Sequence, residues 1–226
     1  YGFVALITVF TGFMALFVDA GLSYAIIRSD YGIRYYKAIS NLSLLIGAGL
    51  FIIMLMLAYP ISLFYDNKAL LIPAIVLASN FIVQSINVVP SAILHKELKF
   101  NKVGLIRLMS TILRIGLMIL MAYRGYSYWS LIVPIIIVSI FRSIVLSIAS
   151  GFYFRFFPWL YSRLAMRTTR SLIANITGFN IINYWARHAD NLIIGKIYGA
   201  ADLGIYNRAY RILNISMNLT TNLFGR

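Results

Sequence analysis

Arginines inside long apolar segments are the residues of this chain best suited to chemistry. Arg114, Arg142 and Arg187 each lie near the middle of a segment long enough to cross a bilayer. An ionised side chain at that depth costs about 2.5–3.5 kcal/mol on insertion scales, so it must face water, an anion or a carboxylate. The only acids in these segments are Asp19 and Asp190. Because arginines outnumber acids, and because guanidinium binds phosphate in a bidentate manner, the pattern predicts a cationic path for an anionic ligand.

This expected path includes two further arginines near the end of the chain. Its members are Arg114, Arg142, Arg187, Arg208 and Arg211. In the alternative, these arginines pair with the two acids or with helix C-terminal carbonyls and only hold a bundle together. Asp19 and Asp190 are candidate sites for coupling to H⁺ or Na⁺, because a carboxylate in a low-dielectric cavity can have a raised pKa. The alternative for both acids is an ion pair with a nearby arginine.

Polar residues recur in steps of three and four along most of these segments, which places each set on one helical face. The expected lining of a shared polar interior is Asn80, Gln84, Asn87, Asn180, Asn183 and Asn214. Similar stripes run from Arg107 through Ser110 and Thr111 to Arg114, and from Ser139 to Ser143. Helices with such stripes cannot all face lipid, so they are expected to converge on a hydrated interior.

The segments that carry these residues predict an all-α, polytopic transmembrane helix bundle. The 226 residues are 61% hydrophobic and only 12% charged, about half the charge of soluble domains. Seven segments reach the roughly 20 residues that a membrane helix needs, and they are too long for barrel strands. They cover residues 2–27, 38–64, 69–94, 103–123, 128–154, 171–197 and 203–224.

Basic residues alternate between the connections, which predicts the orientation of the chain. The six connections carry three, one, three, one, four and one Lys or Arg. By the positive-inside rule the first, third and fifth face the cytoplasm, and the chain starts outside. The net charge of +14 therefore indicates loops at an anionic leaflet rather than nucleic-acid binding.

Other chemistry finds little support. The chain has no cysteine, and His188 and Asp190 are two residues apart and so do not share a helical face. We therefore expect no catalytic residues, no metal and no cofactor. A membrane enzyme would need an acid, base or nucleophile at a membrane boundary. A passive scaffold would have no use for arginines in the middle of the membrane.

Three motifs resemble those of Wzx-type polysaccharide flippases, in the branch of colanic acid and teichuronic acid exporters. They are DNLIIGKIYGAADLGIYNRAY at residues 190–210, FVDAGLSYAIIR at 17–28 and PSAILHKELKF at 90–100. The resemblance places the chain in the multidrug/oligosaccharidyl-lipid/polysaccharide exporter superfamily and implies two six-helix lobes around a central cavity. Residues 1–154 would form most of the N-terminal lobe, 155–170 a cytoplasmic linker, and 171–226 the start of the C-terminal lobe. The first helix and the C-terminal helices would be missing from this chain.

The same resemblance implies a function. Flippases of this kind move undecaprenyl-diphosphate-linked oligosaccharides from the inner to the outer leaflet of the cytoplasmic (inner) membrane for cell-surface polysaccharides, such as lipopolysaccharide or exopolysaccharide. They work by alternating access coupled to an ion gradient, H⁺ or Na⁺. The alternative is a cation-coupled multidrug antiporter of the same superfamily, whose cationic drugs an arginine-rich cavity would repel.

Overall fold

The computed structural model describes residues 2–19, 21–153 and 159–224 of the chain, with side chains described outside 159–176, 211–212 and 214–224. Within this part every regular element is helical. Five stretches are long and apolar enough to cross a membrane, which confirms a multi-pass helical bundle. They are Gly2–Arg28, Ile33–Phe64, Lys68–Lys96, Phe100–Tyr123 and Trp129–Ser150.

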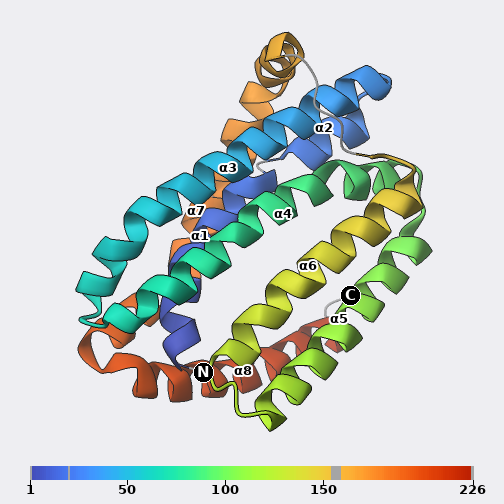
Figure 1. The fold of residues 1–226 in the computed structure, drawn as a ribbon. Helices are drawn as coiled ribbons and strands as arrows, with labels where there is room; N and C mark the ends of the chain where they lie inside the picture. The colour runs from blue at the N-terminus through green and yellow to red at the C-terminus, as the bar shows by residue number, and fades with distance from the viewer. Residues whose placement is uncertain (1, 20, 154–158, 225–226) are drawn as a thin grey trace.

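Two long helices follow these five stretches. Helix α7 (Trp159–Ile197) begins within the segment expected to be a linker, and α8 (Gly199–Phe224) follows it after one residue. Both overlap predicted spans, but neither is among the five apolar stretches found within the described residues. Asn and Arg residues interrupt both helices, and their passage across the membrane remains a prediction. Figure 1 shows α8 running across the lower end of the bundle in that view.

The first apolar stretch is broken rather than continuous. Helix α1 (Gly2–Asp19) ends just before Gly21, whose φ of 80° is left-handed, and α2 (Leu22–Arg28) begins after it. Glycine adopts this conformation without a Cβ penalty. The Asp19 carboxylate accepts a hydrogen bond from the Ser23 N–H at 2.8 Å, which satisfies one of the amides left open at the start of α2. The break therefore fixes the position of the Asp19 carboxylate at the end of α1.

Helix α3 (Ile33–Phe64) packs against α4 (Leu71–Lys96), which a short 3₁₀ turn, η1 (Lys68–Leu70), precedes. Gly47 of α3 permits close approach, since a Cβ there would lie 2.8 Å from the Ser85 Cβ. Beside it, the Ser43 hydroxyl donates to the Ser85 carbonyl at 2.9 Å. The largest buried cluster forms around this pair of helices and reaches Leu203 of α8.

Helix α6 (Trp129–Ser150) lies between α4 and α5 (Phe100–Tyr123), as Figure 1 shows. The Ser143 hydroxyl links α6 to α4 by donating to the Val83 carbonyl at 3.4 Å. Helix α5 buries only Val103, Ile106 and Ser110. One flank of α5 is therefore free to form the wall of a cavity.

Candidate functional site

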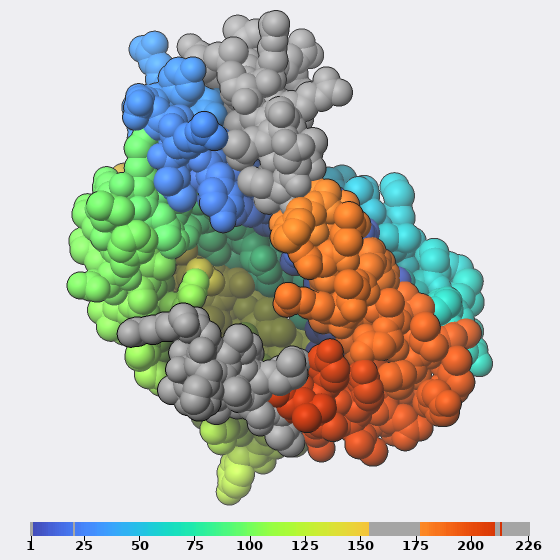
Figure 2. Space-filling model, turned by 180° about the vertical axis from the view of Figure 1, so that it is seen from behind, coloured from blue at the N-terminus to red at the C-terminus, as the bar shows by residue number. Residues whose placement is uncertain are grey.

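A cavity of about 450 Å³ lies between α1, α2, α4, α5 and α6. Figure 2 shows a hollow on the back of the molecule between α5 on one side and α7 on the other. The cavity residues come from around the middle of the long helices and from their predicted cytoplasmic halves. The described residues of its lining carry guanidinium, amide, hydroxyl and carboxylate groups.

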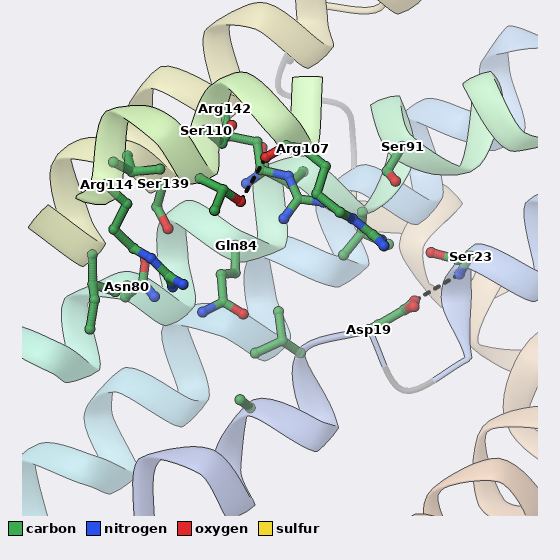
Figure 3. A pocket seen from close by; sticks show the side chains of 17 residues that line it. Asp19, Ser23, Asn80, Gln84, Ser91, Arg107, Ser110, Arg114, Ser139 and Arg142 are labelled. Atoms are coloured by element: carbon green, nitrogen blue, oxygen red, sulfur yellow. Dashed lines mark hydrogen bonds between the residues drawn. The ribbon is translucent and has the colours of Figure 1, made fainter. Parts of the chain in front are cut away.

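Three arginines form one wall of this cavity. Arg107 and Arg114 extend from α5 and Arg142 extends from α6, and Figure 3 shows all three side chains reaching toward the cavity. None of them forms an ion pair within 4.0 Å with a carboxylate among the residues that the structure describes. The Nε atom of Arg142 is buried without a hydrogen-bond partner. The wall is therefore cationic and has donors to spare for an anion.

The facing wall comes from α4 and carries amides. Asn80, Gln84, Asn87 and Ser91 all line the cavity, as the steps of four, three and four predict. The buried Oδ1 atoms of Asn80 and Asn87 have no hydrogen-bond partner. Buried polar atoms are nearly always paired with protein or water, so these carbonyls are positioned to accept hydrogen bonds from a hydroxylated ligand or from water.

Among the residues that the structure describes, Asp19 is the one carboxylate that lines the cavity. It lies at the break between α1 and α2, across the cavity from the arginines in Figure 3. One of its oxygens accepts the hydrogen bond from the Ser23 N–H. Asp19 thus contributes negative charge to a cavity whose other charged groups are positive.

The predicted site residues of α7 lie apart from this cavity. Arg187 is exposed, and Asn180 and Asn183 are half-buried. Asp190 accepts hydrogen bonds from the Tyr206 hydroxyl at 2.6 Å and from the Asn191 N–H at 2.8 Å.

The predicted residues of α8 are likewise not among the cavity residues that the structure identifies. Arg208 is exposed on α8. The side chains of Arg211 and Asn214 lie outside the described residues. The structure therefore brings together five predicted polar and arginine residues and one predicted acid: Asn80, Gln84, Asn87, Arg114, Arg142 and Asp19.

Arg107 and Ser110 were not among the predicted site residues, although both line the cavity. The signal was present, because they share the polar stripe of α5 with Arg114. Ser110 is buried, and its hydroxyl has no hydrogen-bond partner. Weighing the whole stripe, rather than only its arginine nearest the membrane centre, would have found both residues.

Comparison with known proteins matches the whole chain to one family. Residues 1–225 match the model of a family described as polysaccharide biosynthesis protein. The teichuronic acid biosynthesis protein TuaB of Bacillus subtilis (strain 168) is 25% identical over 213 residues, which are 91% of this chain and 42% of that protein. The lipopolysaccharide biosynthesis protein WzxC of Escherichia coli (strain K12) is 29% identical over 124 residues, 54% of this chain and 24% of that protein.

The chain thus spans less than half the length of the curated relatives that it matches. No solved structure matches it significantly. The matches confirm the resemblance to Wzx-type proteins that the three motifs carry. With five apolar helices and a family match from end to end, the chain belongs to the polysaccharide biosynthesis protein family of multi-pass membrane proteins.

Proposed function

We propose that the intact protein is a transporter of the cytoplasmic (inner) membrane that flips an undecaprenyl-diphosphate-linked oligosaccharide to the outer leaflet. The observation that carries the proposal is the cavity wall of Arg107, Arg114 and Arg142, which has no carboxylate partner among the described residues. A diphosphate is the part of such a lipid that needs this wall, because its oxygens accept bidentate hydrogen bonds from guanidinium.

The two walls suit the two chemistries of the cargo. The arginines of α5 and α6 hold the diphosphate, and the amides of α4 take sugar hydroxyls as donors and acceptors. Neither interaction forms or breaks a covalent bond, and the proposed activity is transport rather than catalysis. A cavity of hydrogen-bonding groups within apolar helices lets the polar headgroup pass while the prenyl chain stays in lipid.

The path continues on the second part of the chain in this proposal. Arg187, Arg208 and Arg211, with Asn180, Asn183 and Asn214, line its extension along α7 and α8. Asp19 and Asp190 are the proposed sites of coupling to H⁺ or Na⁺, and Asp19 has the stronger support because it lies in the cavity lining.

A multidrug antiporter is the second candidate, and the charge of the cavity disfavours it. Typical substrates of such antiporters are cations, and three arginines against one aspartate would repel them. Transport of a cationic dye by the purified protein would favour the antiporter.

The arginine wall is tested in the intact protein by single replacement of Arg107, Arg114 and Arg142 with glutamine. Each change is expected to lower the export of lipid-linked oligosaccharide by roughly tenfold or more, since a charge-assisted hydrogen bond contributes about 1.5–3 kcal/mol. Export is measured as surface polysaccharide in cells and as flipping of a defined lipid-linked sugar in vesicles, with the amount of protein in the membrane quantified alongside.

Arg124→Gln is the matched control. It removes the same charge just beyond the end of α5, at an exposed position outside the cavity, and is expected to leave export unchanged. Wild-type export from all three cavity variants would refute the cationic path.

A further inference from the structure

We propose that the outer half of α7 forms a closing contact with α1 and with the end of α3, and that transport requires this contact to open. We call it the outer clasp and define it by Tyr184, Gly195 and Lys196 of α7. The inference rests on the proposed function, because it names the step by which the cavity would reach the outer leaflet.

Helix α1 lines the cavity with one part of its length and contacts α7 with another. Its residues Ala15, Val18 and Asp19 line the cavity, toward the predicted cytoplasmic end. The contacts of α1 with α7 run from its predicted outer half to just past its middle, and involve Thr8, Val9, Gly12 and Phe13. The cavity and the clasp therefore occupy successive levels of one helix.

The first part of the clasp is a hydrogen bond to the helix backbone. The Tyr184 hydroxyl donates to the Val9 carbonyl at 2.5 Å and lies 3.4 Å from the Thr8 carbonyl. Gly12 makes room for it, since a Cβ there would lie 2.8 Å from the hydroxyl oxygen. The rings of Phe13 and Trp185 pack beside it, 5.2 Å apart.

The second part lies about three turns further along α7, at its outer end. Gly195 is buried, and a Cβ there would lie 2.6 Å from the Leu6 Cδ2 and 3.1 Å from the Tyr65 Cε1. Next to it, the Lys196 ammonium donates to the Phe64 carbonyl and lies 5.0 Å from the centre of the Phe64 ring. Phe64 is the last residue of α3, so this cation meets the negative end of a helix dipole.

These contacts share a form suited to opening and closing. A glycine surface has no side chain that interlocks with its partner, and the polar contacts join side chains to backbone carbonyls on the other side. The two polar contacts can separate and form again without moving a buried apolar side chain, whereas opening at Gly195 also parts it from Leu6 and Leu203 of the main buried cluster. The cavity lies on the cytoplasmic side of the clasp, so the closed clasp corresponds to an inward-facing state, and separation of α7 from α1 would give the outward-facing one.

Cysteine cross-linking in membranes tests the clasp in the intact protein. This chain has no cysteine, and any cysteine elsewhere in the protein is replaced by serine. The pair Leu6→Cys and Gly195→Cys is treated with a short bifunctional thiosulfonate; Leu6→Cys also removes the nearest side-chain atom that the new Cβ would meet. We expect efficient cross-linking, loss of export while the link is intact, and recovery of export after reduction.

The matched control pairs Leu6→Cys with Ile193→Cys, two residues away on α7 at an exposed position. This pair is expected to cross-link poorly. Equal yields for the two pairs would show that the clasp does not form, and full export by the cross-linked Leu6–Gly195 protein would show that the contact does not open. Cross-linking yield does not depend on the cargo, so the two proposals can fail separately. If the cross-linked protein stops exporting while the arginine variants remain fully active, the cargo assignment is wrong and the clasp is supported.

A second variant tests the clasp without a cysteine at Gly195. Lys196→Met keeps the length of the side chain and removes its charge, and Ser139→Cys in the cavity lining serves as the reporter. We expect a membrane-impermeant maleimide added from outside to label the reporter faster in the Lys196→Met protein than in its parent. Lys102→Met, an exposed change at the other end of the bundle, is expected to leave labelling unchanged. Equal labelling of parent and Lys196→Met would overturn the proposal.

Discussion

At the level of single residues, the main feature of this molecule is the set of three guanidinium groups around one cavity. Arg107, Arg114 and Arg142 repel one another, and none of them lies within 4.0 Å of a described carboxylate. In the proposed function, a bound diphosphate would offset that repulsion, so the charge of the cavity would contribute to affinity for the cargo. The buried carbonyls of Asn80 and Asn87, which have no hydrogen-bond partner, would likewise accept hydrogen bonds from the proposed sugar hydroxyls.

Asp19 has two roles that substitutions can separate. Its carboxylate accepts the Ser23 N–H, and it is also a proposed site of ion coupling. Asp19→Asn keeps an oxygen acceptor and removes the charge, so we expect stability to be retained and the effect of an ionophore on export to disappear. Asp19→Ala also loses the hydrogen bond, and we expect it to cost about 1 kcal/mol of stability.

Thermal unfolding in detergent measures the stability of both Asp19 variants, and export with and without the ionophore measures coupling. If Asp19→Asn still exports in an ionophore-sensitive manner, Asp19 is not the coupling site. If it unfolds as readily as Asp19→Ala, the charge itself holds the start of α2.

The sequence predicted the chemical character of the site residues better than it predicted which of them share a cavity. Steps of three and four identified the polar faces of α4 and α5 from the chain alone, because a helix repeats every 3.6 residues. They could not show that Arg142 shares a cavity with Arg114 while Arg187 lies elsewhere. That distinction depends on how α6 and α7 rotate and pack, and no residue spacing within one helix encodes it.

At the scale of elements, the apolar stretches gave the first five spans within a few residues of their observed ends. The break after Asp19 was not predicted, because the hydropathy of the surrounding residues is continuous across Gly21. The structure shows which residues mark the break. Asp19 lies two positions before Gly21, and its carboxylate accepts a hydrogen bond from the first turn of the next helix. For α7 and α8 the segments were correct as helices, and their passage across the membrane remains a prediction.

The packing of α3 on α4 gives a matched pair of glycine substitutions. Gly47→Val would place a Cβ 2.8 Å from the Ser85 Cβ and 2.9 Å from the Phe81 carbonyl oxygen, and the backbone atom cannot move aside cheaply. We expect a loss of about 1–3 kcal/mol from overpacking, measured by thermal unfolding of the purified protein.

Gly49→Val is the control on the same helix, because nothing lies within 4 Å of a Cβ at that position. We expect its stability to stay within about 0.5 kcal/mol of the parent. Equal destabilisation by both changes would mean that valine weakens the helix itself and that close approach at Gly47 is not required.

In the whole molecule, the cavity and the clasp follow one another along the direction of the long helices. Around α1, the lining residues and the clasp residues follow one another along the chain. The second part of the chain takes part in the main buried cluster through Ile194, Ala200 and Leu203. The two expected lobes therefore meet in an apolar contact near the end of α3 and the start of α4, and the polar cavity begins around the middle of α4 and extends toward its other end.

Which leaflet the cavity faces depends on the orientation of the bundle, and single cysteines decide it. The alternation of basic connections predicts that the turn between α4 and α5 is cytoplasmic, whereas the turns before α4 and after α5 are outside. Asn101→Cys, Ala69→Cys and Tyr126→Cys report these three turns from exposed positions in or beside them. We expect an impermeant maleimide to label Ala69→Cys and Tyr126→Cys in intact cells, and Asn101→Cys only after the membrane is opened.

The reverse pattern would invert the molecule, so that the clasp would close the cytoplasmic side and the cavity would face outward. Labelling of all three from one side would mean that α4 and α5 do not both span, since each crossing must change the side on which the chain emerges.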